Sequence, residues 1–264
     1  MPPLRTRRDP PPFRRVEVAR VEDLTPRLRR LTLSGPELAG LPQAGPAASV
    51  RLLVPDGGAL VLPTWNGNVW LFDDGRRAPI RTLTPRRIDG AQLDVDIVLH
   101  GSGPIATFAA DSKQGAPAAV SGTGRGTDIP DDGAPWLLLG DESALPAIAT
   151  MLEALPTGSE VLVLVEVTDP DARLALPAHP GAAVTWCDLP AGEVPGSALV
   201  AAALDGPLRS DRLDPAARVW AAGEAASVQR IRRHLFEDLG HPRTRTVIRG
   251  YWKHGRASAD DDAS

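Results

Sequence analysis

The chain has 264 residues, 42% of them hydrophobic, and a formal net charge of −4 at pH 7, so it is long enough for two domains with cores of their own. The acidic balance argues against nucleic-acid binding, which needs a basic surface, and no segment approaches the roughly 18 apolar residues of a membrane span. The single cysteine, Cys187, excludes an internal disulfide and any four-cysteine iron–sulfur or zinc site. We therefore expect a cytoplasmic monomer that has no metal site of its own and binds neither nucleic acid nor membrane.

The first half of the sequence reads as short strands. Residues 15–22 alternate through Val16 and Val18, residues 49–54 form an apolar run, and residues 92–100 alternate with Leu93 and Val95 on one face. Residues 61–72 predict a hairpin around an Asn66-Gly67 two-residue turn. Strands with almost no helix predict an antiparallel β-barrel over residues 14–123.

The second half changes pattern after residues 122–135, which are rich in Gly, Pro and Asp and read as a linker. Apolar strands then alternate with helices, of which residues 224–239 form the strongest, with Gly240 as its stop signal. A last strand is expected at residues 244–248. This alternation predicts a parallel-sheet α/β domain of the nucleotide-binding type over residues 135–255, with ligands at the carboxyl ends of the strands. Residues 1–13 and 256–264 are expected to be disordered tails.

Five short motifs follow one another in an order and spacing that carry a family resemblance. They are Arg81-Thr82-Leu83-Thr84, Leu99-His100-Gly101-Ser102-Gly103-Pro104, Gly140-Asp141-Glu142-Ser143-Ala144-Leu145-Pro146, Ala222-Gly223-Glu224 and Gly250-Tyr251-Trp252-Lys253. From about residue 14 to residue 255, this set resembles the siderophore-interacting proteins, a branch of the ferredoxin-reductase superfamily. The resemblance implies a flavin-binding barrel that precedes a domain of the NAD(P)H-binding type.

The first motif is similar to the flavin motif of that superfamily. The resemblance implies that Arg81 pairs with a phosphate of FAD, that the Thr84 hydroxyl lies near flavin N5, and that Thr82 and Leu83 lie beside the cofactor. Leu83 stands where the family usually has a tyrosine, so stacking on the ring is lost at this position. The alternative is an ordinary barrel strand with a surface arginine.

The second motif closes a strand and opens a helix, because proline is tolerated in the first helical turn. Backbone N–H groups at such a helix start form an anion site. The resemblance implies that the FAD pyrophosphate is held there by His100, Gly103, Pro104, Ile105, Ala106 and Thr107. The alternative is a plain strand-to-helix turn.

The third and fourth motifs follow two strands of the α/β domain, where NADPH or NADH would meet the sheet, and Ser143 is expected to be the N-cap of the helix that follows the first of these strands. The resemblance implies cofactor binding by Gly140, Asp141, Glu142, Ser143, Gly223 and Glu224. The two adjacent carboxylates disfavour a phosphate, so they are expected to bind ribose or flavin hydroxyls, to face away, or only to favour the helix dipole. Glu166 would suit the ribose of NADH and Arg173 the 2′-phosphate of NADPH, and the sequence leaves this choice open.

The fifth motif resembles the C-terminal Gly-Tyr-Trp ending of the family, and the resemblance implies that Tyr251 and Trp252 close over the flavin. Arg249, Lys253 and His254 offer positive charge for an anionic ferric chelate, although a terminal lysine is often simply solvated. The function implied is an FAD-dependent reductase that passes electrons from NAD(P)H, or from an electron-donor protein, to ferric iron in a siderophore and releases ferrous iron. No side chain is assigned as acid or base. Two alternatives are a general NAD(P)H:flavin or quinone reductase and a non-catalytic flavin- or siderophore-binding protein.

Overall fold

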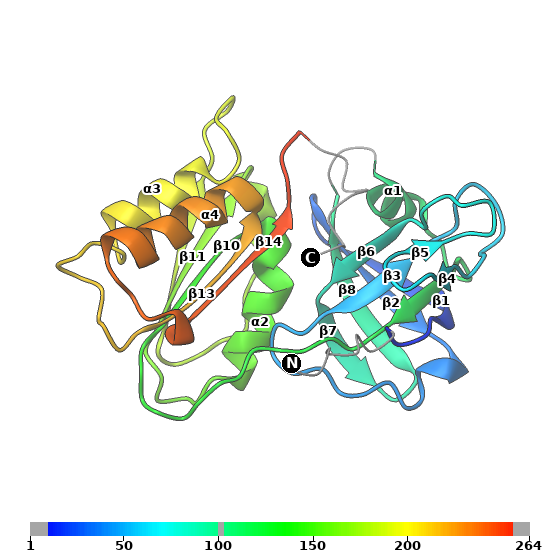
Figure 1. Cartoon of the computed structure of the whole chain (residues 1–264), viewed down its shortest axis with the longest axis horizontal. Coiled ribbons are helices and arrows are strands. Elements are labelled where there is room, and N and C mark those ends of the chain that lie inside the picture. Colours follow the sequence, from blue (N-terminus) through cyan, green and yellow to red (C-terminus); the bar gives the residue numbers. More distant parts are fainter. Residues whose placement is uncertain (1–9, 100–102, 256–264) are drawn as a thin grey trace, which may run out of the picture.

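The structure is a computed structural model that describes residues 10–99 and 103–255. An antiparallel sheet, curled into a half-barrel, is followed by a parallel α/β domain (Figure 1), which confirms the predicted fold class. The antiparallel sheet has the order β6-β3-β9-β1-β2-β8-β7. Its strands are β1 (Arg14–Thr25), β2 (Leu28–Ser34), β3 (Val50–Leu53), β6 (Ile80–Leu83), β7 (Pro85–Asp89), β8 (Gln92–Val98) and β9 (Pro117–Ser121).

Alternation in the sequence decides which side chains enter the half-barrel, because successive strand residues point to opposite faces. Val18 and Leu31 are fully buried in one core with Leu93 and Val95. Two short helical segments accompany this sheet, η1 (Pro36–Leu38) and α1 (Pro104–Asp111). The predicted N-terminal tail is wrong at its end, because Phe13 is buried and packs with Leu53.

The predicted hairpin is present, but its turn is longer than expected. Strand β4 (Thr64–Trp65) pairs with β5 (Trp70–Leu71), and Trp65 lies opposite Trp70, so the turn spans residues 66–69. The side chain of Asn66 accepts hydrogen bonds from the backbone N–H groups of Asn68 and Val69. These bonds stabilise a four-residue turn, which the Asn-Gly pair alone did not indicate.

The parallel sheet has the order β12-β11-β10-β13-β14. Helix α2 covers the face turned toward the half-barrel, and α3 and α4 cover the opposite face (Figure 1). The strands are β10 (Trp136–Asp141), β11 (Val161–Val167), β12 (Ala182–Asp188), β13 (Arg218–Glu224) and β14 (Thr246–Trp252). The helices are η2 (Glu142–Ala144), α2 (Leu145–Ala154), η3 (Pro170–Ala172), α3 (Ser197–Asp205), α4 (Ala225–Arg233), the π-helical η4 (His234–Asp238) and η5 (Arg243–Arg245).

Two details of the α/β domain differ from the prediction. Asp141, rather than Ser143, caps the segment after β10, since its side chain accepts a hydrogen bond from the Ser143 N–H. Strand β14 reaches Trp252, four residues beyond the predicted end, because it pairs in parallel with β13 as far as Glu224. The predicted final motif therefore lies on a sheet strand.

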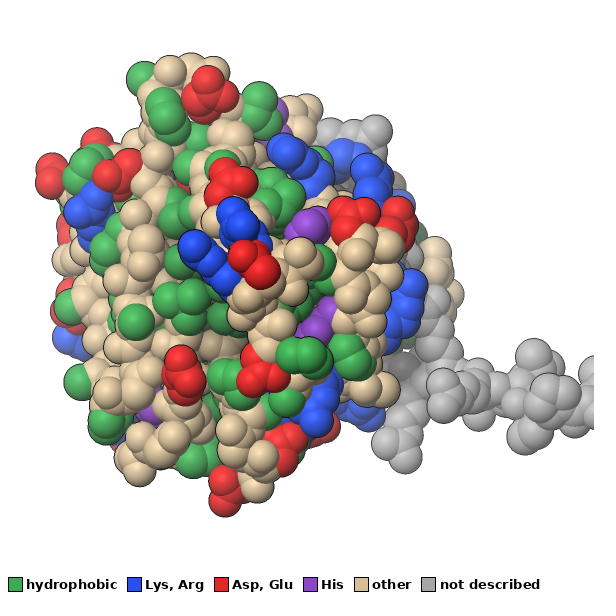
Figure 2. Space-filling model, turned by 90° about the vertical axis from the view of Figure 1, so that its left-hand side faces the viewer, with side chains coloured by type: hydrophobic (Ala, Val, Ile, Leu, Met, Phe, Trp, Pro, Cys, Tyr) green, Lys and Arg blue, Asp and Glu red, His purple; other side chains and the backbone are tan. Residues whose placement is uncertain are grey.

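The two domains are packed together. Leu28 and Ala47 of the half-barrel belong to the core that α2 forms with the parallel sheet. Both backbone polar groups of Ala47 bond to the other domain, its N–H to Thr150 Oγ1 at 3.0 Å and its carbonyl oxygen to Arg249 at 3.2 Å. On the face of the α/β domain that points away from the half-barrel, acidic and basic side chains are interspersed with apolar ones (Figure 2).

Candidate functional site

Helix α1 begins beside a cavity of about 740 Å³. Gly103 is the N-cap and makes no side-chain cap bond, and Pro104 stands in the first turn. The helix start therefore has first-turn N–H groups that no capping side chain covers. Pro104 and Thr107 line the cavity together with Asp111 and Lys113. His100 was also expected here, but it lies outside the described residues.

Strand β6 carries the residues expected to contact the flavin. Arg81 is half-buried and donates from Nη1 to the carbonyl oxygen of Ile80 at 2.7 Å. Thr82 is exposed, and Leu83 is half-buried against the core of the half-barrel. Thr84 follows the strand and is buried. Arg81 and Leu83 therefore lie on the same face of β6, because side chains two apart share a face.

The Thr84 hydroxyl meets Tyr251 across the boundary between the domains. The two side chains lie close enough to interact, and burial raises the pKa of the Tyr251 phenol above its usual value. Tyr251 also packs edge-to-face on Trp220 of β13, with ring centroids 6.4 Å apart. The structure thus brings together the first and last sequence motifs, which are 167 residues apart in the chain.

Asp141 is a junction of three strand ends. Its Oδ2 accepts hydrogen bonds from the Glu224 N–H and from Trp252 Nε1, both at 2.8 Å, and its Oδ1 accepts from the Ser143 N–H at 2.9 Å. Burial raises the pKa of this carboxyl, and the hydrogen bonds it accepts partly oppose that shift. The carboxylate is therefore bonded within the protein and holds Trp252 in place.

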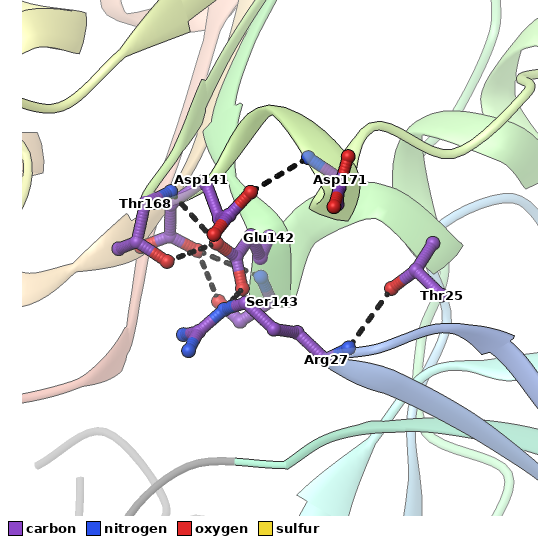
Figure 3. A network of polar contacts seen from close by, with 8 residues as sticks. Thr25, Arg27, Asp141, Glu142, Ser143, Thr168 and Asp171 are labelled. Atoms are coloured by element: carbon purple, nitrogen blue, oxygen red, sulfur yellow. Dashed lines mark hydrogen bonds and ion pairs between the residues drawn. The ribbon is translucent and has the colours of Figure 1, made fainter.

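Glu142 connects the two domains. Figure 3 shows Glu142 between Arg27, which reaches over from the half-barrel, and Thr168, which follows β11. Arg27 Nε lies 2.8 Å from Oε2, while the N–H and hydroxyl of Thr168 donate to Oε1 at 2.8 and 2.7 Å. Ser143 donates its hydroxyl to Asp141. Neither carboxylate of this acidic pair is directed into solvent.

The other acidic residues at this edge of the sheet cap helices. Glu166 accepts from the N–H groups of Gly196 and Leu199 at 2.5 and 2.9 Å at the start of α3, and burial raises the pKa of its carboxyl. Glu224 caps α4 through the Ser227 N–H at 2.9 Å and also accepts from the backbone N–H of His254. Arg173, the alternative nucleotide contact, bonds to both carboxylate oxygens of Asp188.

Two glycines of the motifs have packing roles at the same edge. A Cβ on Gly140 would lie 2.4 Å from the Cβ of Ala144. A Cβ on Gly223 would lie 2.5 Å from Oδ2 of Asp141, and Gly223 has φ of +149°. Both positions therefore require glycine because neighbouring atoms approach so closely.

The basic residues in and beside the last motif lie in the second half of β14 and just after it. Arg249 is half-buried and bonds to Ala47, whereas the side chains of Lys253 and His254 are exposed. The ring of Trp252 lies edge-to-face with that of His254, at 6.5 Å between centroids. Positive charge thus stands next to the Thr84–Tyr251 contact along one strand.

Sequence reasoning did not find Arg27 and Ala47, which join the domains, or Thr168, which bonds to Glu142. Only Ala47 carries an unusual backbone signal, a φ of +50°, and that signal is visible only in the structure. Within residues 10–99 and 103–255, no group of three His, Cys, Asp or Glu side chains is placed to hold a metal ion. In the same ranges, no helix combines the length and apolar character that crossing a membrane requires.

The residues present fit the flavin dinucleotide that the resemblance implies. The start of α1 offers backbone N–H groups to a pyrophosphate, and a Cβ on Gly103 would meet nothing within 4 Å, so the backbone there is open to a ligand. Arg81 supplies a guanidinium suited to a phosphate. The cavity beside α1 is lined by Pro104 and Thr107 but by none of Arg81, Thr84 or Tyr251.

Comparisons with known proteins agree with this arrangement. Residues 17–126 match the siderophore-interacting FAD-binding domain, and residues 134–255 match the siderophore-interacting protein family. The crystal structure of a siderophore utilization protein from T. fusca is 34% identical, with a TM-score of 0.79 over 96% of this chain and 97% of that one. The siderophore-interacting protein SipS from Aeromonas hydrophila is 30% identical, with a TM-score of 0.75 over 93% of both chains.

A curated relative is also similar along nearly its whole length. The ferric vibriobactin reductase of Vibrio cholerae is 28% identical over an alignment of 250 residues that covers 92% of this chain and 90% of that protein. The order of the two matched domains is the order of the half-barrel and the parallel sheet. This chain therefore belongs to the siderophore-interacting protein family and carries that family's FAD-binding domain.

Proposed function

We propose that this protein is a cytoplasmic FAD-dependent reductase that takes electrons from NAD(P)H and passes them to ferric iron in a siderophore. In this proposal residues 14–123 form the FAD-binding domain, and residues 135–255 form the domain of the NAD(P)H-binding type. The observation that supports it is the proximity of Thr84 and Tyr251, since Thr84 belongs to the motif proposed to bind flavin and Tyr251 lies on β14 near the basic residues.

Arg81 and the start of α1 would hold the phosphates of FAD. Bound FAD supplies the conversion between a donor of two electrons and an acceptor of one. The buried Thr84 hydroxyl, which lies near Tyr251, would orient the reactive edge of the ring. Tyr251 and Trp252 would exclude water from that edge, since Trp252 is held by Asp141.

Arg249, Lys253 and His254 would attract the chelate. A siderophore holds Fe(III) through hard anionic oxygen ligands, and the less charged Fe(II) binds these ligands more weakly. Exposed positive charge at an open surface raises the encounter rate with an anionic substrate. The similarity to a ferric vibriobactin reductase supports ferric chelates as the acceptor class.

The experiment that tests this function leaves out the nicotinamide donor. Protein loaded with FAD is photoreduced without oxygen and mixed with a ferric tris-catecholate, and the flavin absorbance and trapped Fe(II) are followed together. We expect reoxidation with two Fe(II) formed for each flavin. Slow reoxidation by the chelate but fast reoxidation by free flavin or quinone would support the general reductase instead. A protein that cannot be loaded with FAD would support the non-catalytic binding role.

A further inference from the structure

The parallel sheet has one place where its strand order reverses, between β10 and β13. In open sheets of this kind, a dinucleotide crosses the carboxyl ends of the strands at such a switch point, and its pyrophosphate rests on a helix N-terminus. Here the switch point lies at Asp141 and Gly223, the ends of the two neighbouring strands. The crevice between these two strand ends is where a dinucleotide would be expected to bind, so its occupant decides how a dinucleotide is held.

The crevice is filled by the carboxylate of Asp141. Oδ2 of Asp141 spans from β10 to the Glu224 N–H at the end of β13 and to the indole of Trp252 on β14. Gly223 approaches this oxygen so closely that a Cβ there would clash with it. The side chain is buried and already accepts hydrogen bonds from the donors that surround it. A pyrophosphate would have to displace it.

The neighbouring helix starts are also occupied by the chain's own carboxylates. Glu166 accepts two N–H groups at the start of α3, and Glu224 caps α4. Glu142 accepts from the Thr168 N–H beside β11. A phosphate brought to this edge would therefore find these backbone N–H donors already bonded to carboxylates of the chain.

We infer that Asp141 stands in the place of a dinucleotide's pyrophosphate, so that the hydride donor engages this protein through its nicotinamide end alone. The inference rests on the proposed function and makes Asp141 a determinant of donor specificity. The donor gives one hydride, a proton with two electrons, to the flavin and leaves as the oxidised pyridinium. Its adenosine half takes no part, so NADH, NADPH and reduced nicotinamide mononucleotide (NMNH) are equivalent donors.

Two measurements on the FAD-loaded protein test this. ADP-ribose, which has the pyrophosphate and adenosine but no nicotinamide, is titrated by calorimetry, and we expect a Kd weaker than about 1 mM. Anaerobic stopped-flow reduction with NMNH and with NADH should give second-order rate constants within about threefold of each other. Sub-millimolar binding of ADP-ribose, or reduction by NMNH about a hundredfold slower than by NADH, would overturn the inference.

Substitutions test whether Asp141 is the residue that excludes ADP-ribose. Asp141→Gly opens the crevice and removes the charge, and it should bind ADP-ribose at least about tenfold more tightly than the original protein. Glu142→Gln is the matched control, since it removes a neighbouring charge without opening the crevice, and it should bind ADP-ribose no better. A folded Asp141→Gly protein without this gain, or an equal gain in Glu142→Gln, would overturn the assignment.

Thermal unfolding shows whether Asp141→Gly folds. If it does not, Asp141→Asn replaces it, which keeps the shape of the side chain and should still exclude ADP-ribose. Tight binding of ADP-ribose to Asp141→Asn would show that the charge of Asp141, and not the space its side chain occupies, excludes the pyrophosphate. That result would contradict the inference that the side chain fills the crevice. Reoxidation of photoreduced protein by the ferric chelate uses no nicotinamide donor. That measurement therefore separates failure of this inference from failure of the proposed function.

Discussion

At the scale of single residues, the candidate site depends on polar groups whose partners lie far away in the chain. Tyr251 lies next to Thr84, and Trp252 donates a hydrogen bond to Asp141. Arg81 and Lys253 differ from these residues, because their charged groups are the ones proposed to contact a ligand. Substitutions at these two positions therefore test ligand binding more directly than they test folding.

Replacing Arg81 tests its proposed contact with FAD phosphate. Arg81→Ala should weaken FAD binding about tenfold or more, because a hydrogen bond to a charged group contributes roughly 1.5–3 kcal/mol. Fluorescence titration of the apo-protein with FAD measures this affinity. Arg87→Ala is the control, since Arg87 is exposed on β7 and pairs with Asp89. Equal FAD affinities of Arg81→Ala and Arg87→Ala would show that Arg81 does not contact the flavin.

Reversing the charge of Lys253 tests the docking of the chelate. Lys253→Glu should raise KM for an anionic ferric siderophore more than KM for NADH, and added salt should shrink the difference because it screens exposed charges. Arg233→Glu reverses a charge at an exposed position of α4, on the face of the sheet that points away from the half-barrel. This control should change neither KM. An equal rise in both constants for Lys253→Glu would contradict the assignment.

At the scale of elements, the helices of the α/β domain begin on carboxylates that come from strand ends. Glu166, near the end of β11, caps the start of α3, and Glu224, at the end of β13, caps the start of α4. The C-terminal end of the helix formed by α4 and η4 is capped in a different way. After η4, Gly240 adopts φ of +62°, and the N–H of buried His241 bonds to the Leu235 carbonyl oxygen.

Removing the carboxylate at the start of α3 should destabilise the fold. Glu166→Ala leaves the buried N–H groups of Gly196 and Leu199 without acceptors, and each unsatisfied buried group costs about 1–3 kcal/mol. Urea unfolding monitored by circular dichroism measures the loss. Asp169→Ala removes an exposed cap from the short η3 and should cost much less. Similar losses for both variants would show that burial at Glu166 does not matter.

The turn after η4 should make stability depend on pH. Burial lowers the pKa of His241 below its usual value, so the unfolded chain binds its proton more readily than the folded one. This contribution to stability is present above the unfolded pKa, near 6.5, and is lost as pH falls through the lower folded pKa. His241→Gln should flatten the decline in unfolding free energy below neutral pH, whereas His254→Gln, at an exposed position, should not. An unchanged slope in His241→Gln would contradict this origin.

At the scale of the whole molecule, the two domains are joined by ion pairs of unequal burial. The Arg27–Glu142 pair has a carboxylate side chain that is 9% exposed, whereas Glu153, the partner of Arg86, is 46% exposed. Both pairs run from the half-barrel to the parallel domain. Because a buried carboxylate that loses its partner remains poorly solvated, the pairs should contribute differently to stability.

Substituting each arginine compares the two pairs. Arg27→Met should lower the unfolding free energy by roughly 1.5–3 kcal/mol, since it removes a charged hydrogen bond from buried Glu142. Arg86→Met should cost no more than about 1 kcal/mol, because exposed ion pairs contribute little. Chemical unfolding at low and high salt measures both, and only the Arg86 pair should respond strongly to salt. The reverse ranking would mean that burial does not decide the strength of these contacts.

The sequence by itself determined the two-domain plan and the family. Apolar alternation in residues such as Leu93 and Val95 predicted the half-barrel, because side-chain direction in a strand depends only on spacing along the chain. Strand–helix alternation predicted the parallel sheet, and five motifs in order indicated the siderophore-interacting proteins. Even the hairpin at Asn66 was found, although its turn length was not.

Only the tertiary structure decided what the polar residues of the motifs bond to. The sequence left open whether Asp141 and Glu142 bind ribose or flavin hydroxyls, face away, or only favour the helix dipole. In the structure Asp141 joins three strand ends and Glu142 joins two domains. Glu166, a candidate for ribose, caps α3 instead. A residue's type limits which bonds it can form, whereas its partner depends on which distant segments the fold brings within hydrogen-bonding distance. Periodicity along the chain carries no information about that distance.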